Sequence, residues 1–388
     1  MKIRRSALLI LAIALLPSTA SANAGTPLMW ASMIHLVFGN AIIGIIEGVL
    51  LSRIFNCPAR RSILILIAAN YVSAWVGGFL LTGVIIPLPD ITIENIRFWF
   101  CTFVGVAFLV TLLIELPFYW FVLRPQGQVL LRAVKATALV NTISYGLLFS
   151  WYWVASGTSM MTQLQVVSPS SLDQGDEYAL YFISIDGTQI LQTDLNGHHR
   201  TVLREVVATH RNDRLFTRRN TQTGYDLFVH LDSDQRENER ENLIATNFSE
   251  LAPVEWRISE GHSEKSEGTW FNFGYVPSLA SNSDWEFRTG FWPIEGIRCD
   301  NKKMNASVRF SLETPFAAWI ARNATHLERG IVVFQLGDNQ ICILDPESRR
   351  IAMIARGKGP IVAKLTMSNK TSLPTGNRSP ISTPTALP

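Results

Sequence analysis

The chain has 388 residues, 48% of them hydrophobic, and a formal net charge of only +3 at pH 7. A charge this small gives no electrostatic support for nucleic-acid binding, and the length allows roughly two or three domains. The composition is uneven, because residues up to about 156 are rich in Leu, Ile, Val, Phe and Trp while the remainder is polar.

The first 24 residues have the pattern of a secretory signal peptide. Three basic residues precede a short apolar run, and Ala22-Asn23-Ala24 fits the A-x-A cleavage pattern. The alternative is an uncleaved first membrane helix, but the apolar run is short for a crossing and ends at Pro17. We therefore predict cleavage after Ala24, which leaves Gly25 as the mature N-terminus.

Four apolar segments follow, and each is long enough to cross a hydrocarbon core of about 30 Å as a helix. They are Pro27–Leu51, Ser62–Ile86, Phe98–Leu123 and Ala136–Val154. The first and third loops carry most of the basic residues, which marks them as cytoplasmic. A cleaved signal independently leaves Gly25 outside, so residues 25–156 predict a four-helix transmembrane domain in the plasma (inner) membrane, with the polar half of the chain exported.

The first of these segments has a distinctive face. Asn40 and Glu47 lie seven residues apart, and Gly44 and Gly48 fall on the same side of the helix. Small residues four apart allow a second helix to approach closely. This face is therefore expected to pack inside the bundle.

A layer of polar side chains is predicted at one depth of the bundle. Counting inward from the cytoplasmic loops, Glu47, Asn70, Glu115 and Asn141 lie roughly 6–12 Å from the inner end at 1.5 Å per residue. An intramembrane carboxylate is costly unless it is paired or used. The layer is either a proton or cation site or a hydrogen-bonded structural layer, and the narrowness of a four-helix bundle favours the structural role.

The polar half is predicted to be an all-β domain. Residues 157–175 form a linker rich in Ser, Thr, Gln and Met, and residues 176–365 contain short β-type runs separated by turn signals such as Asp186-Gly187. Residues 366–388 are dominated by Ser, Thr and Pro, a composition typical of a disordered tail.

An internal repeat occurs within this half. Asp186-Gly187-Thr188-Gln189-Ile190 is followed by Asp194, and Gly337-Asp338-Asn339-Gln340-Ile341 by Asp345, with 340 − 189 and 345 − 194 both 151. A hydrophobic strand precedes each copy. Such units resemble β-propeller blades of roughly 40–45 residues, and the resemblance implies about four or five blades between residues 178 and 365. A β-sandwich with similar hairpins is the alternative.

Cys299 and Cys342 both lie in the predicted exported half, where oxidation is permitted, so a disulfide is preferred to two buried thiols. The sequence has no CxxC pair, P-loop, nucleophile elbow or HExxH motif. It therefore predicts no metal, no cofactor and no catalytic residue.

Two functions follow from this organisation. The first is a non-enzymatic binding or scaffolding protein, whose helices contact membrane lipid and hold a β-rich domain toward a protein partner in the envelope. The alternative is a membrane component of an ion- or proton-linked transport or sensing system that uses Glu47 and Glu115.

Overall fold

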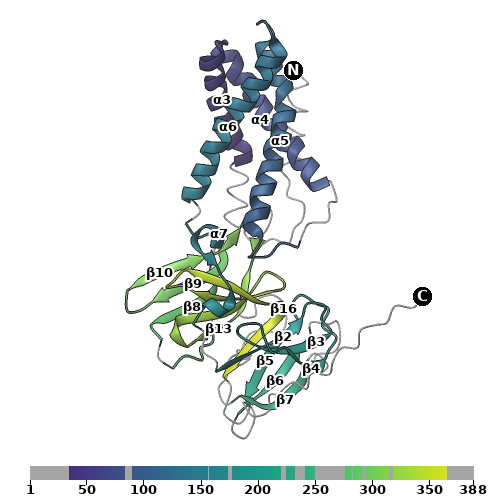
Figure 1. The fold of residues 1–388 in the computed structure, drawn as a ribbon, viewed down its shortest axis with the longest axis vertical. Coiled ribbons are helices and arrows are strands. Elements are labelled where there is room, and N and C mark those ends of the chain that lie inside the picture. The colour runs from purple at the N-terminus through teal and green to yellow at the C-terminus, as the bar shows by residue number, and fades with distance from the viewer. Residues whose placement is uncertain are drawn as a thin grey trace, which may run out of the picture.

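The computed structural model describes residues 35–83, 90–155, 157–173, 177–219, 224–231, 241–249, 276–281, 283–291, 294–313 and 318–364. The predicted signal peptide, its cleavage site and the Ser/Thr/Pro-rich tail lie outside these residues. Within them, a helical bundle stands on one side of a β-rich domain (Figure 1).

Four long helices form the bundle. They are α3 (Asn40–Phe55), which continues a π-helical turn at His35–Gly39, α4 (Ala59–Gly83), α5 (Ile96–Leu123) and α6 (Val129–Ala155). Two of them are long and apolar enough to cross a membrane, with mean hydropathies of 1.6 over Val37–Phe55 and 2.2 over Ile96–Leu123. Among the described residues, this measure therefore supports the predicted four crossings for α3 and α5 only.

The bundle combines a buried polar layer and a buried apolar cluster with many exposed apolar side chains on its outer surface. Glu47 and Glu115 are almost fully buried, whereas Leu113, two residues before Glu115, exposes 73% of its surface. Gly44 and Gly48 confirm the expected close approach of a second helix, because a Cβ atom at either position would lie 2.5 Å from a backbone atom of α4. Exposed apolar side chains around buried carboxylates are compatible with helices that lie in a membrane.

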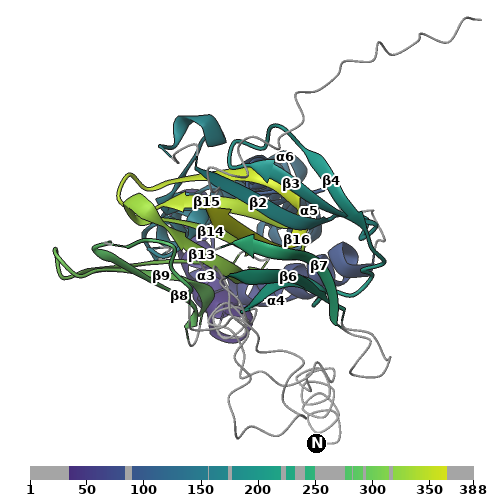
Figure 2. The same ribbon diagram turned by 90° about the horizontal axis from the view of Figure 1, so that it is seen from below.

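The described residues of the β-rich domain form four sheets, whose strand pairs are antiparallel except for one. The largest has the strand order β13-β14-β15-β16-β2-β3-β4, and β1 pairs with β16 in parallel. Its strands are β1 (Gln165–Val166), β2 (Tyr178–Ser184), β3 (Gln189–Asp194), β4 (Thr201–Glu205), β13 (Ala321–Leu327), β14 (Ile331–Leu336), β15 (Gln340–Asp345) and β16 (Arg350–Lys364). Figure 2 shows how this sheet curves beneath the bundle.

Three smaller sheets complete the domain: β5-β6-β7, β10-β9-β8 and β11-β12. Their strands are β5 (Arg214–Arg219), β6 (Tyr225–His230), β7 (Glu241–Ser249), β8 (Trp285–Phe291), β9 (Ile294–Asn301), β10 (Ala306–Phe310), β11 (Leu312–Glu313) and β12 (Ala318–Trp319). A short helix, α7 (Met160–Gln163), and two 3-10 turns, Pro169–Ser171 and Glu328–Gly330, lie between strands.

Strand β16 belongs to two parts of the large sheet. Its first half, from Arg350 to Arg356, pairs with β15, and its second half, from Gly357 to Lys364, pairs with β2. The register shifts between Lys358 and Ile361, within the sequence Gly-Lys-Gly-Pro. Gly359 has a φ of +58°, and a Cβ there would lie 2.3 Å from the Arg214 Cα of β5, so the bend requires glycine.

Both copies of the predicted repeat are antiparallel hairpins. Strands β2 and β3 enclose the Asp186-Gly187 turn, and β14 and β15 enclose the turn at residues 337–339. The two hairpins lie in one curved sheet, joined through β16. The likeness to propeller blades therefore extends to the hairpins and to the curvature of the sheet, and no further in the described residues.

The segment before α5 fixes the bundle to the β-rich domain. Arg356 forms a bidentate ion pair with Asp90, with N···O distances of 2.6 and 2.9 Å, and its hydrogen bonds hold the pKa of that carboxyl below its usual value. The Ile93 N–H donates to Gln340 Oε1 at 2.7 Å. Arg97 donates to two backbone carbonyls of the α7 segment, and Ile93, Ile96 and Phe100 share a hydrophobic cluster with strands of the domain.

Candidate functional sites

The first candidate site is a buried polar network that connects all four helices. Glu47 of α3 accepts hydrogen bonds from Asn70 Nδ2 of α4 and Ser144 Oγ of α6, both at 2.6 Å. Glu115 of α5 accepts from Ser73 Oγ of α4 at 2.8 Å and from Asn141 Nδ2 of α6 at 3.1 Å. The structure therefore brings the four residues of the predicted polar layer together.

Asn40, the fifth residue that the sequence analysis places within the membrane, is buried but lies apart from this layer. It precedes Glu47 by seven residues, which is about 10 Å along a helix. Its position at the start of α3 places it near the opposite end of the helix from the basic loop at residues 53–61.

The network has an internal symmetry that the sequence reading missed. Asn70 and Ser73 of α4 occupy the same positions in an N-x-x-S motif as Asn141 and Ser144 of α6, since 141 − 70 and 144 − 73 are both 71. Each glutamate binds the asparagine of the helix that follows it and the serine of the other hairpin. The hairpins α3–α4 and α5–α6 are thus equivalent halves around the two carboxylates.

No basic side chain takes part in the hydrogen bonds described for these carboxylates. Their donors are two amides and two hydroxyls, and Asn141 Nδ2 also lies 3.4 Å from the Tyr119 hydroxyl oxygen. Two carboxylates held close together at low dielectric repel each other when both are ionised. A proton or a small cation held between them would remove that repulsion.

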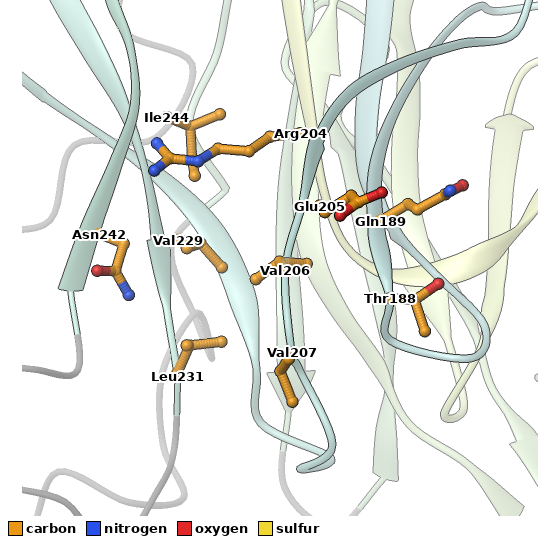
Figure 3. Close-up of a pocket in the computed structure, with 10 residues that line it drawn as sticks. All are labelled: Thr188, Gln189, Arg204, Glu205, Val206, Val207, Val229, Leu231, Asn242 and Ile244. Atoms are coloured by element: carbon orange, nitrogen blue, oxygen red, sulfur yellow. The ribbon is translucent and has the colours of Figure 1, made fainter.

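The second candidate site is a cleft in the β-rich domain, with a volume of about 550 Å³. It lies between β4 and the pair β6 and β7, and its lining is shown in Figure 3: Thr188, Gln189, Arg204, Glu205, Val206, Val207, Val229, Leu231, Asn242 and Ile244. Arg204 reaches across from β4 and donates to the Leu243 carbonyl of β7 at 2.5 Å. The volume is within the range of roughly 300–1,000 Å³ that ligand clefts have.

No known protein family matches this chain, and no curated protein is similar to it.

The cleft lies at the solvent-exposed edge of a hydrophobic core. Strands β2, β3, β5, β6 and β16 and the segment after β4 contribute a cluster of buried side chains: Ala179, Tyr181, Ile183, Ile190, Ala208, Leu215, Leu227, Val229, Ile361 and Ala363. Val206, Leu231 and Ile244 lie at the edge of this cluster, where they are partly buried, and they also line the cleft. The two sheets therefore form a curved half-barrel that is open between β4 and β7.

Cys299 and Cys342 are free thiols in this structure, so the predicted disulfide is not formed. Cys299 lies in β9 and Cys342 in β15, strands of different sheets, and both side chains pack inside one hydrophobic cluster. Burial raises the pKa of both thiols. An oxidising compartment would permit a disulfide bond, but in this structure both cysteines pack as small apolar side chains.

A buried histidine in β13 fixes a distant segment to the large sheet. His326 contacts Ser278 Oγ through Nδ1 at 2.9 Å and Ser283 Oγ through Nε2 at 3.1 Å. Burial, together with the charge of Lys302, lowers its pKa to about 4. A neutral ring between two hydroxyls suits a structural role, because such a histidine is a weak base.

Proposed function

We propose that this protein is an anchored binding protein of the plasma membrane. Its four helices cross the membrane, and its β-rich domain lies outside the cytoplasm, where the cleft between β4 and β7 receives a partner from the cell envelope. The bundle acts as an anchor in contact with membrane lipid.

Charge and length support this orientation. Helices α4 and α6 contain 25 and 27 residues, so each is about 37–40 Å long, enough to cross a hydrocarbon core of about 30 Å. The basic residues Arg53, Arg60 and Arg132 lie at the end of the bundle away from the Asp90 segment that docks on the β-rich domain. By the positive-inside rule that basic end is cytoplasmic.

The cleft is the observation on which the binding role rests. It is concave, partly apolar, and lies in a domain held to the bundle by an ion pair and a shared hydrophobic cluster. Such a rigid attachment keeps the cleft at a fixed position relative to the membrane, as a recognition domain requires.

Reporter fusions and site-specific cross-linking test this proposal. Reporters placed after Arg60 and Arg132 should be cytoplasmic, and reporters after Asp90 and Gly175 should be exported. A photo-reactive residue at Val207, in the cleft, should cross-link an envelope protein in living cells, while one at Met304, an exposed residue of the β9–β10 turn, should not. An exported Arg60 reporter, or equal cross-linking at both sites, would contradict the proposal.

A second function, a proton- or cation-linked component, is favoured by the network of Glu47 and Glu115. Two equivalent hairpins meet at two carboxylates whose described donors are all neutral. Parallel structural repeats with a polar site at their interface occur in several transporter folds. A proton shared between the two carboxylates would have two nearly equivalent positions.

Infrared spectroscopy of the reconstituted full chain separates the two functions. A proton that exchanges should produce a carboxylic-acid carbonyl band that changes with pH and weakens in Glu47→Gln and Glu115→Gln, whereas a proton held permanently in a structural layer should produce a band that does not change with pH. If the network is only a structural layer, both variants should keep the fold and the envelope cross-link at Val207, because an amide retains most hydrogen bonds of a protonated carboxyl. Ser150→Ala, on the exposed side of α6, is the control.

A further inference from the structure

We propose that the cleft between β4 and β7 binds an extended peptide segment of a partner protein, which adds to the half-barrel as a further strand. The inference rests on the proposed binding function and gives the chemistry of its partner. The segment pairs with the open edge of β4, presents apolar side chains to the core, and carries a carboxylate that meets Arg204.

Both strands beside the cleft, β4 and β7, are edge strands of their sheets. Strand β4 is the last strand of the large sheet and β7 the last of the three-stranded sheet, so neither has a second neighbour among the described strands. The Val206 and Ala208 amides donate to the Thr188 and Gly187 carbonyls on the β3 side. Because backbone groups alternate along an extended chain, the amides of Glu205 and Val207 point away from β3 and toward the open edge.

Several apolar side chains at the open edge are exposed to solvent. The exposed fractions are 55% for Val202, 42% for Leu203, 78% for Val207 and 42% for Leu243 of β7. Natural proteins usually protect such edges with charge, proline or a covering segment. An added strand would bury these side chains and would also cover Val206 and Ile244 at the mouth of the core.

The positive charge of Arg204 predicts that the bound segment carries a negative charge. Figure 3 shows its guanidinium spanning the cleft toward β7, where it donates to the Leu243 carbonyl. Among the described residues it has no acidic partner. Arg204 therefore occupies the Leu243 carbonyl of β7, a hydrogen-bond acceptor that an inserted strand could use. A carboxylate on that strand would then accept hydrogen bonds from the displaced Arg204 guanidinium.

The backbone edges select a peptide over a lipid chain or a small molecule. Only an extended polypeptide supplies alternating N–H and C=O groups at the spacing of a strand. Strand β4 has five residues, so a segment of about five residues, roughly 17 Å long, covers its edge. Closing a half-barrel removes both open edges at once.

The experiment uses the full-length protein in detergent micelles and a phage library of random octapeptides. Enriched peptides should alternate β-branched residues and contain Asp or Glu. When a synthetic copy binds, hydrogen exchange at the Glu205 and Val207 amides should slow by about tenfold or more, since each gains a hydrogen bond. Methylation of the peptide's alternate backbone nitrogens should weaken binding by about tenfold, the effect of losing one or two such bonds.

Two substitutions complete the test. Val207→Lys, which charges the open edge, should abolish peptide binding, while Met304→Lys should bind as the native protein does, with unchanged thermal unfolding in both. Arg204→Glu should reverse the preference from acidic to basic peptides. The inference would be overturned if no peptides are enriched, or if the methylated peptide binds with the same affinity as the unmethylated one. It would also be overturned if the native protein is a dimer and Val207→Lys is a monomer, because that result indicates that a second copy of the chain occupies the cleft. Retention of the envelope cross-link in Val207→Lys, with the photo-reactive residue moved to Asn242, would overturn it while leaving the proposed binding function intact.

Discussion

Replacing Gly48 by alanine should destabilise the bundle by separating α3 from α4. A Cβ at this position would lie 2.5 Å from Ile63 Cα and 2.7 Å from Ile63 N, whereas ordinary contact begins at 3.4 Å. The two backbones must therefore move apart by about 0.9 Å (3.4 − 2.5) at this crossing. Neither obstacle is a flexible side chain, so no rotamer change can absorb the contact.

That movement also affects the polar network. If α3 and α4 separate by about 0.9 Å, the Asn70–Glu47 distance rises from 2.6 Å to about 3.5 Å (2.6 + 0.9), where little hydrogen bonding remains. Overpacking costs about 1–3 kcal/mol and the lost hydrogen bond about 1 kcal/mol. Alanine regains about 1 kcal/mol of helix propensity, so the net loss is about 2 kcal/mol.

The measurement is unfolding of the full chain in mixed micelles, followed by far-UV circular dichroism. Gly105→Ala is the matched control, because a Cβ at Gly105 in α5 has no atom within 4 Å. The control substitution should be neutral or slightly stabilising, and Gly48→Ala should lower the midpoint of the unfolding transition. If both variants shift the midpoint equally, the close crossing of α3 and α4 is not a determinant of stability.

Three further predictions concern other parts of the chain. Ser73→Ala and Ser144→Ala should destabilise the bundle by similar amounts of about 1 kcal/mol each, because the serines occupy equivalent positions, as measured by the same unfolding assay. His326, whose folded pKa of about 4 lies below its ordinary 6.5, should make the β-rich domain most stable above pH 6.5. Stability should fall by up to about 3 kcal/mol as pH drops from 6.5 to 4, because the unfolded state binds the proton more readily, and this slope is measurable by thermal unfolding between pH 4 and 8. Cys299 and Cys342 should react with maleimide only after denaturation, as mass spectrometry of the intact chain would show.

Each of these three has a control. Ser150→Ala should leave bundle stability unchanged, since Ser150 bonds only to its own helix at an exposed position. His326→Gln should remove the pH slope between 6.5 and 4, and a slope that persists would assign it to other groups. A mass lower by two hydrogens in the untreated protein, with the peptides of Cys299 and Cys342 linked in a digest, would show a bond between these two cysteines and contradict their burial as free thiols.

The polar layer could be found from sequence because a helix rises by a constant 1.5 Å per residue. Depth counting along four helices therefore placed Glu47, Asn70, Glu115 and Asn141 at one level. Ser73 and Ser144 were missed, because serine in a helix usually bonds to its own backbone and gives no distinctive signal. The recurrence of N-x-x-S at an offset of 71 residues would have identified both.

The β-rich domain was less accessible to sequence reading. Local turn chemistry identified the hairpins around Asp186-Gly187 and residues 337–339. The pairing of β16 with β2 joins residues far apart in the chain, and no local pattern encodes it. The sequence Gly357-Lys358-Gly359-Pro360 would ordinarily end a strand, but here it bends one strand so that it continues into a second part of the sheet.

The shared strand β16 has a consequence for biogenesis. Lys364, at the end of the last strand, pairs with Tyr178, at the start of the second. Because the chain is made from its N-terminus, β2, β3 and β4 exist before β16, and one edge of their sheet stays unpaired until the final strand is made. The docked segment around Asp90 waits too, because its partner Arg356 lies in the same strand. A chain truncated after residue 349 would therefore leave both the sheet and its attachment to the helices incomplete.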